Sequence, residues 1–462
     1  MTRTLSLMFV LFTVGILNAC TTSSLSPSVS ASTNPSANIH WMAFVNRKVE
    51  NDPSSTLLVV SGYDSNGVHI EGPIYPINKG AHKANSRPAI AFSSTSNIYL
   101  VAVADRVEPV GAAAYDRVAA RFFDKNGTLL KTEYYLFDDK SSIINESLAN
   151  PSLNVGSVQV TYNSLLDEFL VTVQRTTFYP KQLVTSKNGV WAQRLSFNKG
   201  IIGSPIELID NGLADVHSHT VAYADVQGTN PSGGRYLLSY GLGNTLLLDS
   251  QSKMLSVVPL NYGEPKSDQA QPHASYGEVQ GKSMFLLVYT DANNEFCQPG
   301  TNPCPSWSGV WGTFVDPTKT LYMGKPANTP FPISKIDDHF VSKYSHQPQV
   351  TYSPSKKSFY VVWRELPNPN ANVTEKRTHI RGNYVDYYVA PNATKIPVPY
   401  INQVISAATG TCAVTSKPQV CKSVEDPYFP AAHALAKNKV SVFWHQNVGN
   451  GRSIRGKIVT IP

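Results

Sequence analysis

The chain has 462 residues, of which 42% are hydrophobic, 10% aromatic and only 15% charged. This composition supplies a large core and excludes a disordered or highly solvated chain. The net charge of +7 is spread along the chain without a run of Lys and Arg, so we expect no nucleic-acid partner. The length suits roughly two or three average domains, or one long repeat fold.

The N-terminus has the layout of a signal peptide. Arg3 precedes an apolar run over residues 5–17, which is shorter than the roughly 20 residues that span a bilayer. The run ends in Leu-Asn-Ala-Cys at 17–20, which resembles the lipobox of bacterial lipoproteins. The resemblance implies cleavage before Cys20, acylation of that cysteine, for example with palmitate, and an outer-membrane destination because Thr21 follows. The alternative is an ordinary cleavage site beside a chance cysteine.

Acylation of Cys20 would anchor the protein by its lipid in the bacterial cell envelope, on the periplasmic side or at the surface. Each buried acyl CH₂ contributes about 0.8 kcal/mol, so more than one chain gives stable anchoring. A stretch rich in Ser, Thr and Pro follows and lacks core-forming residues. We therefore expect a signal peptide at 1–19, the acylated cysteine and a flexible linker at 20–39, and one folded domain at 40–462.

The expected domain repeats a pattern of three strands. The clearest copy has Pro-Gln-Val-Thr-Tyr at 348–352, Ser-Phe-Tyr-Val-Val-Trp at 358–363 and Ile-Arg-Gly-Asn-Tyr-Val at 380–385. The first element returns at 88–92, 158–162, 219–223, 272–276 and 430–434, the second at 98–103, 168–173, 235–240, 284–289 and 440–444, and the third at 118–123, 190–195, 310–315 and 454–459. A weaker fourth strand follows most copies.

The second element is almost wholly apolar, which indicates a strand buried on both faces. A unit with such a middle strand is unstable alone, whereas stacking the units in a ring buries those faces. Over residues 40–462 the repeats resemble those of secreted bacterial β-propellers, P-x-V-x-Y … Y-L-V-V-W … I-x-G-x-x-V. We therefore expect an all-β fold, a β-propeller of seven four-stranded blades. Six blades are the alternative, with the terminal strands sharing one closing blade.

Four further cysteines form two close pairs, Cys297 with Cys304 and Cys412 with Cys421. In an exported protein such pairs predict disulfides that close local loops. Metal binding is the alternative, but the spacings are not C-x-x-C and neither loop contains a histidine. Histidines near the inner-strand starts, such as His219, occupy non-equivalent repeat positions. We expect no metal and no cofactor.

The candidate binding surface is the propeller face that carries the loops from second to third strands. These loops are long here, and both cysteine pairs fall on that face. Loops stapled onto a rigid scaffold lose less entropy on binding. The candidate binding residues are loop aromatics and basic residues at second-strand ends: Tyr179, Trp307, Arg106, Arg175, Arg364 and His445.

An enzyme could instead use carboxylates at this mouth of the channel. Asp105, Asp291, Glu365 and Asp426 lie where second strands end or inner strands begin, and glycan cleavage needs two carboxylates about 5 to 10 Å apart. The structural alternative is that these residues solvate the strand ends or pair Asp with Arg across blades. The sequence holds no nucleophile elbow, phosphate-binding loop, zinc-protease motif or sialidase Asp-box.

Binding is the function that these observations favour, with a protein or a polysaccharide as the partner of a lipid-anchored propeller. A carbohydrate-active hydrolase or lyase is the alternative, and a purely structural role in the envelope is the third hypothesis. The sequence leaves the oligomeric state open.

Overall fold

Every regular element in the described part of the chain is a β-strand. The computed structural model describes residues 29–33, 39–47, 56–64, 69–70, 74–76, 83–84, 88–107, 115–130, 133–138, 152–178, 186–210, 218–226, 233–240, 244–259, 271–291, 309–319, 329–334, 343–367, 379–390, 403–407, 427–435, 438–448 and 451–462. Within these residues, no helix has the length and hydropathy needed to cross a membrane.

The strands follow one another in antiparallel blades. Blade 1 holds β1 (Val29–Thr33), β2 (Ile39–Arg47), β3 (Thr56–Asp64), β4 (His69–Ile70) and β5 (Ile74–Pro76); blade 2 holds β6 (Lys83–Ala84), β7 (Ala89–Ser93), β8 (Ile98–Val107), β9 (Tyr115–Asp124) and β10 (Tyr134–Leu136); blade 3 holds β11 (Ser152–Asn163), β12 (Glu168–Phe178), β13 (Ser186–Ser196) and β14 (Gly200–Asp210). Blade 4 holds β15 (His219–Asp225), β16 (Gly234–Tyr240), β17 (Asn244–Asp249) and β18 (Met254–Pro259); blade 5 holds β19 (His273–Val279), β20 (Lys282–Asp291), β21 (Gly309–Val315) and β22 (Phe331–Pro332). Blade 6 holds β23 (Lys343–Ser353), β24 (Ser358–Pro367), β25 (His379–Val385) and β26 (Gln403–Ala407); blade 7 holds β27 (Pro427–Ala434), β28 (Lys439–Val448) and β29 (Gly451–Thr460).

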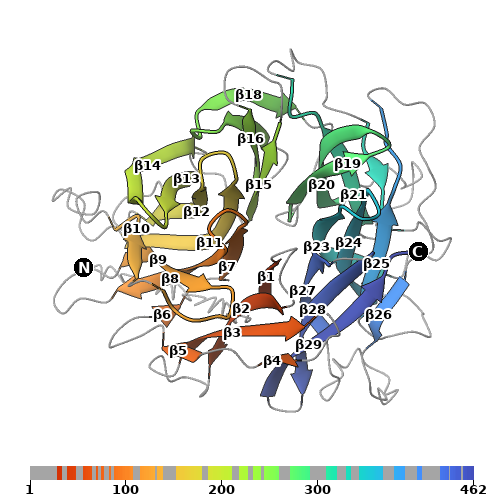
Figure 1. The fold of residues 1–462 in the computed structure, drawn as a ribbon, viewed down its shortest axis with the longest axis horizontal. Helices are drawn as coiled ribbons and strands as arrows, with labels where there is room; N and C mark the ends of the chain where they lie inside the picture. Colours follow the sequence, from red (N-terminus) through yellow and green to blue (C-terminus); the bar gives the residue numbers. More distant parts are fainter. Residues whose placement is uncertain are drawn as a thin grey trace, which may run out of the picture.

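The blades close into a ring, which confirms the predicted β-propeller and favours seven blades over six. The inner strands β1, β7, β11, β15, β19, β23 and β27 each contact the next, and β27 contacts β1 (Figure 1). A single parallel bridge, Leu153 with Tyr115, joins blades 2 and 3 into one continuous sheet. In the described residues, blade 7 has three strands and exchanges none with blade 1.

The second half of the expected linker differs from the structure. Residues 29–33 form β1, the inner strand of blade 1, and all five pair with β2, from Val29 opposite Phe44 to Thr33 opposite His40. The composition predicted a linker because the segment is rich in small polar residues. A strand at a ring centre is held by its backbone ladder, which needs no apolar side chains.

The core consists of apolar clusters between neighbouring blades. On β20, Leu286 and Val288 pack in the cluster shared with blade 6, whereas Phe285 and Leu287 pack in the cluster shared with blade 4. Successive side chains of a strand point to opposite faces of its sheet. The second element of the repeat is therefore apolar throughout because each of its faces contacts another blade.

One aromatic pair recurs in five blades and explains the last residue of the first repeat element. The rings lie directly opposite each other on the first and second strands, with centroids 4.7 to 5.4 Å apart. The pairs are Phe92–Tyr99, Tyr162–Phe169, Tyr223–Tyr236, Tyr276–Phe285 and Tyr352–Phe359. Such cross-strand pairs fix the register of the two strands.

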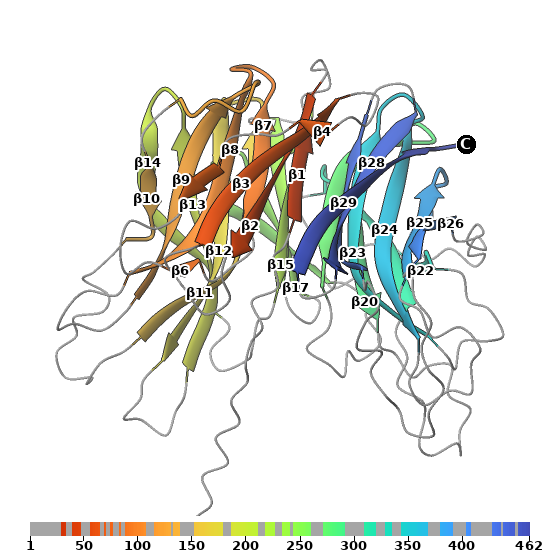
Figure 2. The same ribbon diagram turned by 90° about the horizontal axis from the view of Figure 1, so that it is seen from below.

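The two ends of the propeller differ in their connections. The turns between first and second strands, such as 164–167 and 354–357, lie at one end, here called the hairpin face, which is uppermost in Figure 2. Hydrogen bonds link neighbouring hairpins there: Ser96 Oγ donates to Asp167 Oδ2 (2.6 Å), and Asn438 N donates to Ser355 Oγ (2.9 Å). The second strands end at the opposite face, here called the loop face.

Candidate functional site

The predicted site residues divide between described and undescribed parts of the chain. Those outside the described residues are Cys20, Cys297, Cys304, Cys412, Cys421, Tyr179, Trp307 and Asp426. The backbone places Arg106, Asp291 and His445 at or near the loop-face ends of the second strands β8, β20 and β28. For all of these residues, the predicted roles stay predictions.

Four of the predicted residues occupy one position of the repeat. On each second strand, the candidate residue comes the same number of positions after the strand's member of the aromatic pair. The four candidates are Asp105, Arg175, Asp291 and Glu365. The blades therefore bring these side chains to equivalent places around the loop face. In three blades, the structure also describes what the side chain contacts.

Asp105 is held by an arginine of its own blade. Its residue is 2% exposed, and Arg117 lies directly opposite on β9, with Nε 2.9 Å from Asp105 Oδ2. Arg117 also reaches Asp138 at 3.4 Å and covers the ring of Tyr135, with Cζ 3.4 Å from the centroid. Burial lowers the pKa of Arg117, but the hydrogen bond and charge of Asp105 outweigh it and raise that pKa above its usual value. Arg117 therefore stays charged beside Asp105.

Glu365 has the same kind of partner in blade 6. Its buried carboxylate accepts hydrogen bonds from Arg381 on β25, with Oε1 3.2 Å from Nε and 3.1 Å from Nη2. Arg364, its neighbour, is half-buried. A carboxylate oxygen that is held by two guanidinium nitrogens is fixed in one orientation.

Arg175 occupies the equivalent position in blade 3, where its guanidinium lies over an aromatic ring. The guanidinium of this buried arginine lies 5.1 Å from the ring centroid of Trp191 on β13. Cation–π contact stabilises a positive charge at a partly dry site. The corresponding third-strand position of blade 5 holds Trp311, not an arginine, beside the end of β20.

Sequence reasoning missed Arg117, Arg381 and Trp191, the third-strand partners of these residues. The signal for them is the strand register, since Arg117 faces Asp105 directly and Arg381 lies two residues from the position opposite Glu365. The loops between second and third strands vary in length, so the sequence alone does not give that register. The structure brings Asp105 and Glu365 each to an arginine, and Arg117 also joins Asp105 to a second carboxylate, Asp138.

Two histidines near the channel are internal hydrogen-bonding groups. His219 Nε2 lies 2.9 Å from Thr172 Oγ1 of blade 3, and Val350 N of blade 6 donates to His273 Nδ1 at 3.2 Å. Desolvation lowers the pKa of each imidazole to about 4, so both are neutral at pH 7. Within the described residues, no three His, Cys, Asp or Glu side chains are grouped to hold a metal ion.

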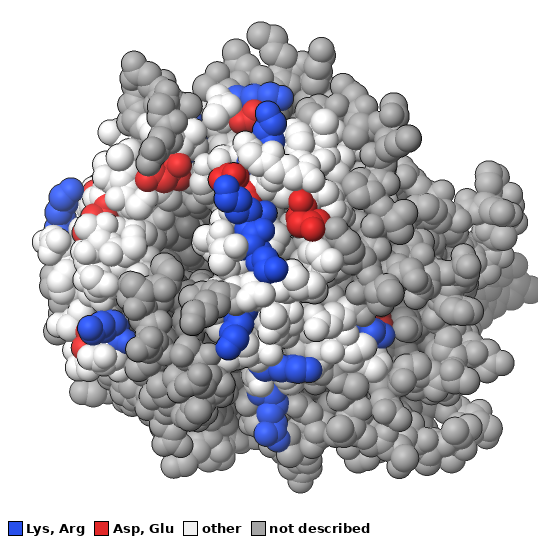
Figure 3. Space-filling model, turned by 45° about the vertical axis from the view of Figure 1, so that its right-hand side comes forward, with Lys and Arg blue, Asp and Glu red and all other residues white. Residues whose placement is uncertain are grey.

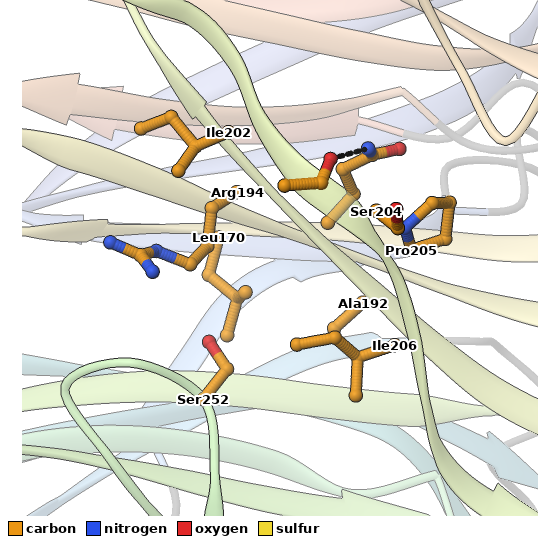
Figure 4. A pocket seen from close by; sticks show the side chains of 10 residues that line it. Leu170, Ala192, Arg194, Ile202, Ser204, Pro205, Ile206 and Ser252 are labelled. Carbon is orange, nitrogen blue, oxygen red and sulfur yellow. Dashed lines mark hydrogen bonds between the residues drawn. The ribbon is translucent and has the colours of Figure 1, made fainter.

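A cavity of about 330 Å³ lies apart from these strand ends, between the outer strands of blade 3 and the turn at Ser252 (Figure 4). It forms where the pairing of β13 with β14 is interrupted between Ala192 and Arg194. Gln193 Nε2 donates to Gly203 O at 3.1 Å in place of the missing ladder bonds. The cavity is on the hairpin side of the blade and is not part of the candidate site.

Comparisons with known proteins find likeness in fold only. No protein-family model matches the chain, and no curated protein matches its sequence. An endo-arabinase from Bacteroides thetaiotaomicron shares 10% identity, with 83% of this chain and 95% of that chain covered and a TM-score of 0.33. An intramolecular trans-sialidase from Ruminococcus gnavus shares 9% identity, with 73% and 89% covered and a TM-score of 0.44. An endo-arabinanase from Bacillus licheniformis shares 9% identity, with 80% of this chain and 92% of that chain covered and a TM-score of 0.31.

Proposed function

We propose that the protein is a lipid-anchored binding module of the bacterial cell envelope that engages a protein or polysaccharide at its loop face. The observation that carries the choice of binding over catalysis is the pairing of Asp105 with Arg117 and of Glu365 with Arg381. A buried carboxylate that an arginine of its own blade already engages serves as the structural partner of that arginine. These two carboxylates are therefore built to position side chains.

The anchor and the fold together define where the partner is met. In the proposed lipoprotein, residues 20–28 connect the acylated cysteine to β1, which starts at the loop face because Val29 lies opposite Phe44 near the end of β2. A chain of that length reaches at most about 30 Å. The loop face is then held close to the membrane, and the partner is a membrane-proximal component of the envelope.

Binding and turnover are tested together on residues 21–462, which contain every described strand. We expect an envelope glycan array or a pull-down from envelope extracts to give a saturable partner, and polysaccharide digests to give no product. Arg175→Ala should weaken that binding because it removes the guanidinium from the repeat position that Asp105 and Glu365 occupy in their blades. Lys125→Ala, on the hairpin side, should leave binding unchanged. Product release would support the hydrolase alternative.

The anchor is tested separately in cells. We expect Cys20→Ser to remove labelling by a palmitate analogue and to shift the protein from the membrane to the soluble fraction. Retention of the label in Cys20→Ser would contradict acylation at this residue without bearing on the loop face.

A further inference from the structure

The cavity between blades 3 and 4 runs from the surface into the interior. Its volume of about 330 Å³ lies at the lower end of the range, about 300 to 1,000 Å³, that small-molecule sites occupy. It is lined by exposed residues of β14, Ser204 and Ile206, and by fully buried ones, Leu170, Ala192 and Ser252. The lining thus combines aliphatic side chains with a few polar groups, which is the composition of ligand pockets.

Hydrogen bonds hold the two walls of the cavity in place. On the blade 4 side, the turn at residues 249–253 is fixed to blade 3, because Asn163 Nδ2 donates to Ser250 O at 3.1 Å. On the blade 3 side, Gln193 Nε2 donates to Gly203 O at 3.1 Å and braces β14 against β13 where their pairing is interrupted. The cavity is therefore preformed, and a ligand would bind without the cost of ordering its walls.

A buried hydroxyl points into this cavity. Ser252 is 0% exposed, and its Oγ has no hydrogen-bond partner among the residues that the structure describes. Figure 4 shows the hydroxyl directed into the cavity, toward Leu170. A buried polar group without a partner costs free energy. A ligand atom that donates to Ser252 Oγ, or accepts from it, would remove that cost.

The turn that carries this hydroxyl favours glycine at the same position, as the matching turn of blade 2 shows. Gly127 N donates to Asp124 O at 3.0 Å, and Ser252 N donates to Asp249 O at 2.9 Å. The backbone is left-handed at both residues, with φ +82° at Gly127 and +70° at Ser252. A left-handed backbone disfavours any side chain. The turn therefore has no need of the serine side chain, whereas the cavity receives its hydroxyl.

Exposed apolar side chains of both blades flank the mouth of the cavity. Ile206 lies opposite Ala192, and Met254 on β18 lies opposite Leu248. Ala192 and Leu248 both pack in the core cluster between blades 3 and 4, and residues directly opposite each other share one face of a sheet. Ile206 and Met254, which are 41% and 54% exposed, are therefore turned toward the same space between the blades.

The charges around the cavity favour a neutral ligand. Lys and Arg gather at several places on the surface seen in Figure 3, but Arg194 is the one charged residue among those that line the cavity. Its Nε already donates to Glu168 Oε2 at 2.9 Å, and Lys199 holds the other oxygen of that carboxylate at 3.3 Å. A charged ligand group would lose its hydration there beside an arginine that is already paired.

We propose that this cavity binds a small apolar molecule that carries one neutral hydrogen-bonding group, such as an alcohol or a phenol. The polar atom of the ligand meets Ser252 Oγ in the interior, and the apolar body contacts Leu170, Ala192 and Ile206. The cavity lies on the hairpin side of blade 3, apart from the loop face. The proposal therefore stands independently of the proposed function.

The test is the titration of residues 21–462 with p-cresol, followed by ligand-observed NMR. We expect saturable binding that Ser252→Gly weakens about fivefold, because one hydrogen bond is lost. Toluene, which lacks the hydroxyl, should bind Ser252→Gly and the unmodified chain alike, so that two ligands and two proteins form a double-mutant cycle. Glycine suits the turn, so Ser252→Gly should not lower the melting temperature.

The mouth of the cavity is tested with a matched pair of variants on β14. Ile206→Glu places a charge at the cavity and should weaken p-cresol binding about fivefold or more. Ile201→Glu is the control, since Ile201 is 42% exposed but lies opposite Leu195, which packs in the cluster between blades 2 and 3. The control introduces the same charge on the other face of the blade and should bind p-cresol as the unmodified chain does.

Four results would overturn the proposal. A lack of saturable p-cresol binding by the unmodified chain would exclude the ligand class. Equal p-cresol affinity of Ser252→Gly and the unmodified chain would show that the hydroxyl takes no part. Equal weakening by the two β14 variants would place the ligand elsewhere. Tighter binding of p-toluate, the corresponding carboxylate, than of p-cresol would assign the cavity to an anion held by Arg194.

Discussion

At the residue scale, ion pairs within blades decide what the loop-face carboxylates do. Asp105 and Glu365 occupy one repeat position, and each is met by an arginine from the third strand of its blade. Removing one member of a buried pair leaves the other as an uncompensated charge. These residues should therefore respond to substitution through stability and not through chemistry.

The substitution Asp105→Asn should lower the free energy of unfolding by about 2 kcal/mol, because Arg117 loses its buried ion partner and keeps its longer contact with Asp138 and its place over the Tyr135 ring. Denaturant unfolding measures this loss. The exposed pair of Lys357 with Glu278 provides the control, since Glu278→Gln should cost less than about 1 kcal/mol. Equal costs for the two substitutions would contradict a structural role for Asp105.

The two histidines with lowered pKa values, His219 and His273, predict a pH dependence of stability. The pKa values of His219 and His273 are lowered to about 4 in the folded chain, whereas an unfolded histidine titrates near 6.5. Between these values the unfolded chain binds more protons, so stability should fall as pH falls from about 6.5 to about 4. Thermal unfolding across this range measures the fall. His219→Gln, which cannot titrate, should flatten the curve, and an unchanged slope would refute the assignment.

At the element scale, close approach of blades depends on glycine at an inner strand. A side chain at Gly277 on β19 would overlap the ring of Tyr352 on β23 of the next blade. Tyr352 also pairs with Phe359, 5.2 Å away in its own blade, so moving the ring away from position 277 would disturb that pair. The glycine thus sets the distance between blades 5 and 6.

Gly277→Ala should therefore destabilise the protein by about 1 to 3 kcal/mol, the usual cost of overpacking. In a chain that already carries Tyr352→Ala, the same change should cost much less, because the ring is gone. A double-mutant cycle measured by denaturant unfolding gives this coupling. Additive costs would mean that the two positions do not meet.

The repeats made the blades predictable, because a strand buried on both faces and an aromatic pair both leave marks in the sequence. β1 has no such sequence pattern, because its position depends on backbone pairing with β2. The partners of Asp105 and Glu365 were equally hidden, because strand register decides which third-strand residue meets them. The sequence identified the positions of the candidate site on the second strands but not their neighbours.

At the scale of the whole molecule, the ring closes by contact between β27 and β1 and not by exchange of a strand within the described residues. Closure then depends on a short strand near the proposed lipid anchor. Residues 34–462 should melt at least about 5 °C below residues 21–462, because blade 1 loses its inner strand. Residues 29–462 serve as the control and should melt with the longer chain. Equal melting of all three would show that β1 is dispensable.

The most direct test of the account is a search for turnover by residues 21–462 on the ligand that the loop face binds. The account predicts saturable binding with no product, and unchanged binding by Asp291→Asn, which alters the carboxylate opposite Gly309 on β21. Release of product that Asp291→Asn abolishes at an unchanged melting temperature would contradict it and establish an enzyme.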